Sequence, residues 1–335
     1  MWLKYRTSIF IGISFSLLFS MLWFFQSLAF ISFISLLLTL LLRSSVDRLT
    51  KKMPRILSSG IVLLAFIAIV ITFLVMVSKT FIPTFAAFIA DIPRISSTLQ
   101  DLPIFHISDF ITQQIEALLK EMTAFSVSAL TSSLSIIFSI FSKFIDLVII
   151  LFVTFYLLKD GDEIKNYLVN LFPLKDNSRI LSLFNDILEA LRTYIRSQIV
   201  ICFITGIVVF LYFTIRDLPY ASVFAAVSGI SEFVPVVGPT LASAFGTILT
   251  TTQAPVYGAQ TLLFYIVLTQ VNHNIIYPYL IGKSLNLHPV AIILSIIFGG
   301  ELHGAIGMFL AVPCMVIIKL VIEDICKDRQ NIITK

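Results

Sequence analysis

The sequence has little charge for its length. Lys, Arg, Asp and Glu together make up 13% of the 335 residues, whereas a soluble domain has about 25%. Hydrophobic residues reach 58%, so too few polar side chains remain to cover a surface that faces water. This composition excludes an ordinary soluble globular protein and predicts that much of the apolar surface faces lipid.

The sequence also lacks the motifs of several enzyme and binding classes. It has no GxxxxGK[ST] phosphate loop, which argues against ATP-driven pumping, and no GxSxG elbow or hydrolase triad. Cys202, Cys314 and Cys326 form no CxxC pair, so neither a disulfide framework nor a zinc site is expected. The net charge of +4 comes from short basic clusters beside apolar runs. We therefore expect no enzymatic activity, cofactor, metal or nucleic-acid partner.

What the sequence has instead is a series of long apolar runs. A helix needs about 20 residues to cross the hydrocarbon core of a bilayer. The candidate spans are residues 8–25, 28–42, 56–77, 136–158, 199–215, 218–252, 256–281 and 289–321. The sequence therefore predicts an all-α fold, a polytopic membrane helix bundle with a small helical extramembrane segment.

Basic residues set the expected orientation, because loops rich in Lys and Arg stay in the cytoplasm. Five basic residues lie between Arg43 and Arg55, after the second candidate span. Both termini are expected in the cytoplasm, and the extramembrane segment is expected to be broken at Pro93 and Pro103. The expected parts are N-terminal membrane helices (1–78), an extracytoplasmic helical segment (79–135), a fourth membrane helix (136–158), a cytoplasmic amphipathic helical segment (159–197), a C-terminal transport core (198–323) and a cytoplasmic tail (324–335).

The candidate spans 218–252 and 289–321 are longer than one crossing requires. Each is interrupted near its middle by helix breakers and a glutamate. The breakers are Pro235, Gly238 and Pro239 in the first segment and Gly299, Gly300 and Gly304 in the second. We expect two re-entrant hairpins in corresponding positions of an inverted repeat, which is typical of a transporter's central site. Two single broken spans are the alternative.

Glu232 and Glu301 are the main candidate residues of a substrate or ion pathway. An acidic side chain at the centre of a membrane helix costs about 2.5–3.5 kcal/mol on insertion scales for Asp. Each glutamate is therefore expected to face a cavity or a partner, where it could exchange a proton for a cation or a polar solute. The alternative is that each is protonated and only holds its hairpin by hydrogen bonds.

Polar residues of the span 256–281 extend the candidate pathway. Gln270 and Asn274 share one helix face at a spacing of four residues, whereas Asn272 lies away from them. Amides can coordinate ions or join helices by hydrogen bonds; the pathway role is favoured for Gln270 and Asn274, and helix joining for Asn272. His303 follows Glu301 closely, but without an HExxH motif it is a candidate for the pathway rather than a metal ligand.

Seven stretches between residues 155 and 313 carry a family resemblance. They are FYLLKDG (155–161), LPYA (218–221), EFVPVVGP (232–239), NIIYP (274–278), IGKSLNLHP (281–289), GGELHG (299–304) and AVP (311–313). Over about residues 136–323 the chain resembles the autoinducer-2 exporter family of bacterial membrane proteins. The resemblance implies a multi-pass, homo-oligomeric transporter of the bacterial inner membrane. Some family members export autoinducer-2, and some exchange sodium or lithium for protons.

Three functions are consistent with these observations. The first is secondary transport that exports a small polar solute, with autoinducer-2 as the candidate. The second is sodium (lithium)/proton antiport, and the third is a membrane scaffold that does not transport. The expected partners are the lipid bilayer, a small polar solute, Na+ or H+, and further copies of the chain.

Overall fold

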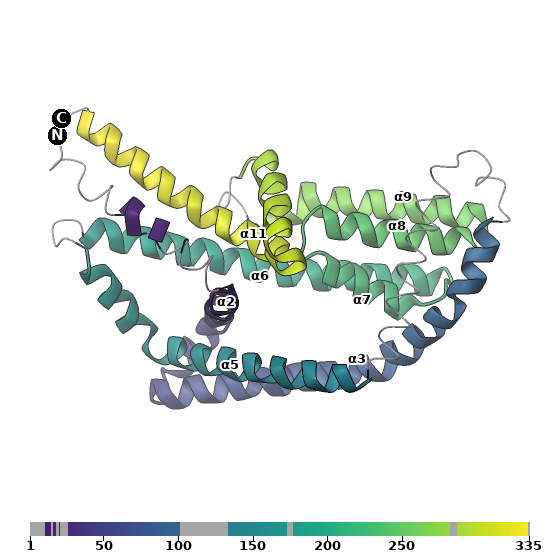
Figure 1. Cartoon of the computed structure of the whole chain (residues 1–335), viewed down its shortest axis with the longest axis horizontal. Coiled ribbons are helices and arrows are strands. Elements are labelled where there is room, and N and C mark those ends of the chain that lie inside the picture. The colour runs from purple at the N-terminus through teal and green to yellow at the C-terminus, as the bar shows by residue number, and fades with distance from the viewer. Residues whose placement is uncertain are drawn as a thin grey trace. The chain divides into compact units, whose positions relative to one another are not determined.

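The structure, a computed structural model, describes residues 11–14, 16–17, 20, 26–100, 133–172, 177–281 and 287–333. All regular elements in these ranges are helical, which confirms the all-α prediction (Figure 1). The elements are α2 (Gln26–Leu49), α3 (Arg55–Gln100), α5 (Ser133–Asn170), α6 (Asn177–Ile215), α7 (Ala221–Ser231), α8 (Val237–Thr251), α9 (Pro255–Val271), the π-helix η3 (Asn272–Ile276), α10 (Tyr277–Ile281) and α11 (Pro289–Ile333).

Within the described residues, three helices are long and apolar enough to cross a membrane. They are Ser27–Leu49, Arg55–Phe73 and Asn177–Ile215. Large apolar side chains such as Leu64 and Ile69 are 67% exposed, as expected for surfaces that face lipid. Most of the candidate span 8–25 lies outside the described residues.

The predicted break at Pro93 is wrong, because α3 continues as one helix from Arg55 to Gln100. Both Pro83 and Pro93 lie inside it. A proline removes one backbone hydrogen bond, but a membrane helix tolerates this where its neighbours compensate. Pro103, the second predicted break, lies outside the described residues.

The chain forms two compact units. The first unit comprises Met1–Ala68, Lys143–Ser197 and Ile281–Lys335, and the second comprises Ile69–Ser142 and Gln198–Leu280. In the first unit, α2, the start of α3 and α5 share an apolar core of Leu42, Val46, Leu63 and Leu158. Polar side chains join α2 to α5 as well, since Ser35 Oγ lies 3.2 Å from the Ile150 carbonyl oxygen to which it donates.

Asp162 of α5 is the centre of an ion-pair cluster in the first unit. Arg43 of α2 donates to one of its carboxylate oxygens, and Arg55 of α3 donates to the other at 3.0 Å. Burial raises the pKa of Asp162. The hydrogen bond from Arg43 and the charges of Arg43, Arg55 and Lys165 outweigh that effect and hold the pKa below its usual value.

Asp162→Asn is expected to lower the stability of the first unit at neutral pH by about 0.2–1 kcal/mol for each ion pair lost, because the cluster is partly exposed. The folded pKa is lower than the unfolded value of about 3.9. The stabilisation is therefore present above that value and is lost as the pH falls through the folded pKa. Thermal melting at pH 3–7 should show a wild-type advantage that shrinks below about pH 4.

Glu163→Gln is the matched control, since this neighbouring side chain is exposed and should melt like the wild type throughout. A wild-type advantage over Asp162→Asn of the same size at pH 3 and pH 7 would contradict the ion-pair explanation.

The second unit packs α6, α7, α8 and α9 around an aromatic core. Phe213 of α6 stacks on Phe224 of α7 with ring centroids 5.0 Å apart, and Tyr212 stacks on Phe264 of α9 at 3.8 Å. A Cβ on Gly229 would lie 2.8 Å from the Cys202 carbonyl oxygen, so α6 and α7 touch backbone to backbone. Such contacts between small residues are typical of membrane helix packing.

The first predicted hairpin is confirmed. The segment 218–252 folds into α7 and α8, which are joined by a turn over residues 232–236. Val236 in this turn has a φ of 69°, so the chain reverses sharply before α8 begins. Figure 1 shows α8 running beside α9 as two adjacent rods.

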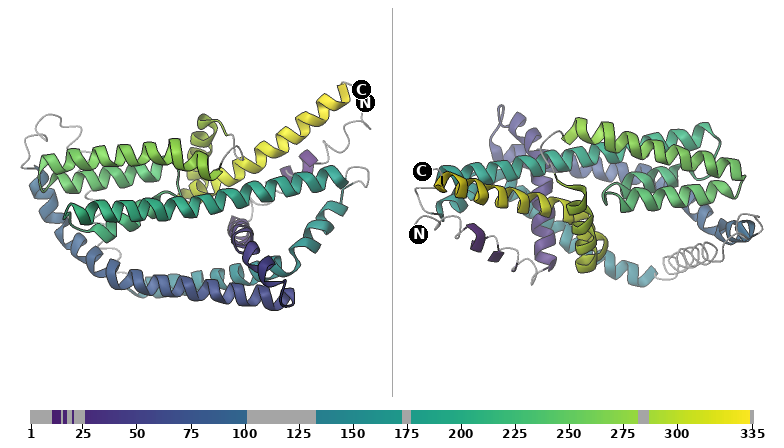
Figure 2. Two further views of the ribbon diagram at one scale, coloured as in Figure 1. Left: turned by 180° about the vertical axis from the view of Figure 1, so that it is seen from behind. Right: turned by 90° about the horizontal axis from the view of Figure 1, so that it is seen from above.

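The second predicted hairpin is also present, although α11 is continuous from Pro289 to Ile333 by its hydrogen bonds. In a straight helix, residues eight apart are separated by about 12 Å along the axis. A Cβ on Gly299 would instead lie 2.4 Å from the Gly307 carbonyl oxygen, so the helix folds back between them. Gly304 has a φ of 57° at the reversal, and Figure 2 shows the sharp change of direction.

Candidate functional site

Glu232 lies at the turn of the first hairpin, directly after the last residue of α7. Its side chain is 3% exposed. The backbone leaves the α-helix here, because the Phe233 N–H bonds to Ile230 and the Val234 N–H bonds to Ser231. The breakers Pro235 and Gly238 follow and are themselves buried. The sequence EFVPVVGP therefore ends one short helix, holds an acidic side chain inward and starts the next helix.

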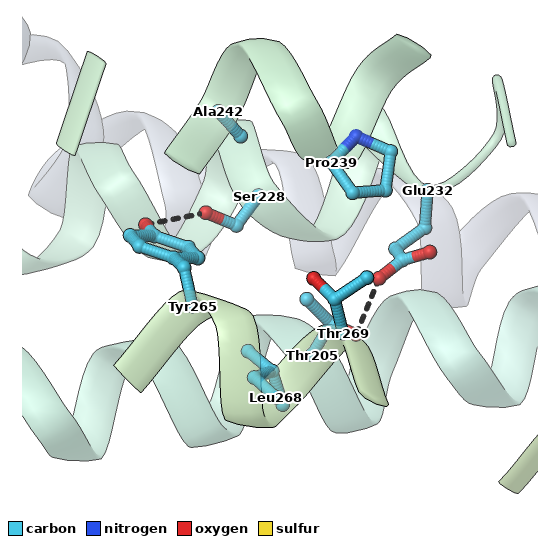
Figure 3. A pocket seen from close by; sticks show the side chains of 8 residues that line it. All are labelled: Thr205, Ser228, Glu232, Pro239, Ala242, Tyr265, Leu268 and Thr269. Atoms are coloured by element: carbon cyan, nitrogen blue, oxygen red, sulfur yellow. Dashed lines mark hydrogen bonds between the residues drawn. The ribbon is translucent and has the colours of Figure 1, made fainter. Parts of the chain in front are cut away.

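Two neutral side chains donate hydrogen bonds to the Glu232 carboxylate. Thr205 Oγ1 of α6 donates to Oε1 at 3.0 Å, and Asn272 Nδ2 donates to the same oxygen at 2.9 Å. Asn272 Nδ2 also lies 2.9 Å from Thr205 Oγ1, so the three side chains form one network. A fourth side chain, Gln198 of α6, donates to the Glu232 backbone carbonyl. Figure 3 shows Thr205 and Glu232 facing each other.

No ion pair balances the Glu232 carboxylate within the described chain. Each of its side-chain hydrogen bonds comes from a hydroxyl or an amide. Burying a carboxylate that has no positive partner is costly unless the group takes up a proton or a cation. We therefore expect the Glu232 carboxylate to bind either a proton or a cation.

Asn272 reaches Glu232 from a π-helical turn that the sequence reasoning missed. The π-helix η3 lies between α9 and α10, and the Tyr277 N–H closes it by donating to the Asn272 carbonyl. Such turns occur mostly as single bulges and are frequent at functional sites. The polar residues Gln270, Asn272, His273 and Asn274 were the available signal, but they did not show which amide faces inward.

Two acceptor oxygens of this network have no hydrogen-bond partner among the described residues. They are Gln198 Oε1 and Asn272 Oδ1, and both are buried. Buried polar atoms are nearly always satisfied by protein or by ordered water. Unfilled acceptors on side chains that contact Glu232 are suited to a cation, a water or the hydroxyl of a solute.

A small cavity of about 10 Å³, room for about one water molecule, adjoins Glu232. Hydroxyl groups and one carboxylate form its polar lining, and Ser228 Oγ lies 3.0 Å from Tyr265 Oη within it. Pro239, one of the predicted hairpin breakers, belongs to its wall (Figure 3). The lining residues are Thr205, Ser228, Glu232, Pro239, Ala242, Tyr265, Leu268 and Thr269.

The other predicted pathway residues lie elsewhere. Gln270 and Asn274 share a face as expected, because Asn274 Nδ2 donates to Gln270 Oε1 at 2.8 Å, but both are exposed. Glu301 belongs to the first unit, close to the reversal at Gly304, and is exposed. The side chain of His303 lies outside what the structure describes. A pathway role for these four residues stays a prediction.

Comparison with known proteins supports the family resemblance over almost the whole chain. A family profile described as "AI-2E family transporter" matches residues 13–327. The chain is 31% identical over 328 residues to YueF of Bacillus subtilis (strain 168), named as a candidate transport protein, covering 92% of this chain and 88% of that one.

Two further relatives match shorter stretches. YrrI of Bacillus subtilis, also named as a candidate transport protein, is 28% identical over 66% of this chain and 63% of its own length. PerM of Escherichia coli (strain K12), named as a candidate permease, is 25% identical over 70% of this chain and 65% of its own. With its apolar helices, its two hairpins and the profile match across both units, the chain belongs to the AI-2E family of membrane transporters.

Proposed function

We propose that this protein is a secondary transporter that exports a small polar solute. It couples the movement of the solute to the movement of protons through Glu232. The observation that carries the proposal is an acidic side chain buried at a hairpin turn, held only by neutral donors and open to a polar pocket. Protonation of Glu232 removes its negative charge, and this loss of charge allows the bound solute to be exchanged.

The pocket lining indicates the class of solute. Thr205, Ser228, Tyr265 and Thr269 each present a hydroxyl group, which can both donate and accept a hydrogen bond. A few such groups in an otherwise apolar cavity can bind a water molecule or one hydroxyl group of a small polar solute. Autoinducer-2 is the first solute to test because the family resemblance names it.

Sodium (lithium)/proton antiport is the second candidate, and a separate observation favours it. Gln198 Oε1 and Asn272 Oδ1 are buried acceptors without a hydrogen-bond partner in the described chain. Both side chains contact Glu232, Asn272 at the carboxylate and Gln198 at the backbone carbonyl. Oxygen atoms of this kind can coordinate Na+ at a helix interruption. In this scheme a cation and a proton alternate at Glu232, and no organic solute is required.

Transport by purified protein in proteoliposomes tests both candidates. The assay follows labelled autoinducer-2 and, with a trapped pH-sensitive dye, the internal pH. We expect solute movement when a proton gradient is imposed, and accompanying proton flow in sodium-free buffer. Proton flow that needs Na+ or Li+ but no solute would instead support antiport.

The absence of both fluxes from well-folded protein would contradict transport at this site and favour the scaffold. The proposed pathway also includes Glu301, Gln270, Asn274 and His303. The same assay on Glu301→Gln tests the role of Glu301, and a loss of transport is expected.

The proposal includes a location in the bacterial inner membrane with both termini in the cytoplasm, and a homo-oligomeric assembly. The basic residues between Arg43 and Arg55 support this orientation. Cys326 is exposed near the C-terminal end, so a membrane-impermeant thiol reagent should label it only after the cells are opened. Labelling of Cys326 in intact cells would contradict the orientation.

A further inference from the structure

Two arginines of α6 converge on one serine of α2 in the first unit. Arg192 Nη2 and Arg196 Nη2 both donate to Ser44 Oγ. A hydroxyl carries no formal charge, so it neutralises neither guanidinium. Arg192 Nε is buried as well and has no hydrogen-bond partner in the described chain.

A third arginine adds to this positive charge. Arg48 follows Ser44 by one helical turn, so both lie on one face of α2. Arg48 and Arg192 are close enough to Arg196 to repel its guanidinium. None of the three arginines lies within 4.0 Å of a carboxylate oxygen in the part of the chain that the structure describes. Glu189, the acidic residue next along α6, is exposed and pairs with none of them.

A neighbouring basic cluster in the same unit shows how this chain balances positive charge elsewhere. Arg43 and Arg55 share the carboxylate of Asp162, and Arg43 also lies 3.7 Å from Asp47. Arg43 and Asp47 occupy one face of α2, and Ser44 and Arg48 occupy the next. Asp47 and Asp162 therefore balance the positive charge on the Arg43 face of α2, whereas the positive charge on the Ser44 face has no acidic partner in the described chain.

We propose that Ser44, Arg48, Arg192 and Arg196 form a binding site for a phosphate-bearing anion. Guanidinium groups bind phosphate through paired N–H donors, and such charge-assisted hydrogen bonds are about twice as strong as neutral ones. Two sources carry this chemistry, the headgroup of an anionic phospholipid and a soluble phosphate. Basic pockets between membrane helices suit the first of these.

The geometry fits a ligand better than a structural contact. Two guanidiniums that share one hydroxyl repel each other, and the charge of Arg48 adds to that repulsion, so without an anion the cluster opposes packing of α2 against α6. A bound phosphate reverses the sign of that contribution, because its oxygens accept from both guanidiniums and from the unpartnered Arg192 Nε. Occupancy of the site would then stabilise the packing of these two helices.

Thermal unfolding of the purified full-length protein in a non-ionic detergent tests the site. One arm titrates inorganic phosphate against sodium chloride of equal ionic strength, and the other titrates short-chain phosphatidylglycerol against phosphatidylcholine of the same chain length. Ligand that binds only the folded protein raises its Tm with concentration. We expect a rise with at least one phosphate-bearing anion and none with its control.

Arg192→Gln/Arg196→Gln is expected to weaken that binding at least about tenfold, because it removes both convergent donors. Lys51→Gln/Lys52→Gln removes the same formal charge from two exposed residues next to α2 and should keep the affinity within about twofold. Arg48→Gln changes only an exposed side chain, so it tests the charge without disturbing the helix contact, and about fivefold weaker binding is expected.

The outcomes separate the two sources. A response to phosphatidylglycerol alone identifies a lipid headgroup, a response to phosphate alone identifies a soluble anion, and a response to both supports recognition of the phosphate group itself. The proposal is overturned if the wild type responds to neither, or if the lysine variant loses as much affinity as the arginine variant. It is also overturned if the arginine variant folds but melts below the wild type in sodium chloride buffer that contains neither phosphate nor phosphatidylglycerol.

Discussion

Replacement of Glu232 by glutamine is expected to reduce transport in proteoliposomes at least about tenfold, equivalent to about 1.4 kcal/mol, while the protein stays folded. Glutamine has nearly the same shape, and its carbonyl oxygen can still accept from Thr205 Oγ1 and Asn272 Nδ2, as Glu232 Oε1 does. The difference is that an amide cannot ionise, so it can neither release a proton nor attract a cation. Transport coupled to Glu232 should therefore stop although the hairpin survives.

Two measurements are needed, because a misfolded protein would also fail to transport. Melting temperature and elution volume in detergent should match the wild type, and the initial rate of solute or proton flux should fall. Glu163→Gln is the control, since it removes a carboxylate from an exposed position on α5. Wild-type flux in Glu232→Gln would remove Glu232 from the transport mechanism and leave it a purely structural role.

Glu232→Gln is expected to affect solute export and antiport differently in one respect. For solute export, the flux of Glu232→Gln should lose its dependence on the proton gradient, whatever slow solute leak remains. For antiport, the variant should lose the Na+-dependent change in internal pH altogether. Asn272→Leu removes one hydrogen-bond donor from the Glu232 carboxylate. It should lower the rate of transport, although Glu232 can still take up and release a proton.

The two hairpins could be predicted from sequence because their signals are local. One glutamate, two prolines and one glycine occur within the eight consecutive residues 232–239, a combination that favours an interruption of a membrane helix. Gly299, Gly300 and Gly304 give an equally local signal, and the structure shows the reversal there. Local chemistry also set the expectation that an acidic side chain would lie buried at the first turn.

The partners of Glu232 could not be predicted in the same way, because they come from distant parts of the chain. Thr205 and Gln198 lie on α6 among apolar residues, and Asn272 lies beyond α9. Whether Asn272 or its neighbours face inward depends on the π-turn, which shifts the helix register after α9 and which the local sequence pattern does not reveal. The preference for Gln270 and Asn274 followed from ideal helix geometry, and their exposure shows that the shared face is not the one that meets Glu232.

Gly238→Ala is the substitution with the largest expected effect on folding. A Cβ at this position would lie 1.8 Å from the Ser231 carbonyl oxygen and 2.6 Å from its carbonyl carbon. Both are backbone atoms at the end of α7, so no side-chain rotation can relieve the clash. The start of α8 would have to move away from α7. Overpacking that forces backbone shifts costs typically about 1–3 kcal/mol and occasionally more. We therefore expect Gly238→Ala to lower the free energy of unfolding by about 3 kcal/mol.

Gly161→Ala provides the matched control for this substitution. A Cβ at Gly161 of α5 meets nothing within 4 Å, and alanine is a better helix former than glycine by about 1 kcal/mol. Thermal melting in detergent should therefore show a strong loss for Gly238→Ala and an unchanged or slightly higher Tm for Gly161→Ala. Because Glu232 lies in the turn that Gly238 closes, the alanine variant should also lose the hydrogen bonds from Thr205 and Asn272, and transport with them. Equal melting temperatures for Gly238→Ala and the wild type would mean that α7 and α8 do not approach as closely as the structure shows.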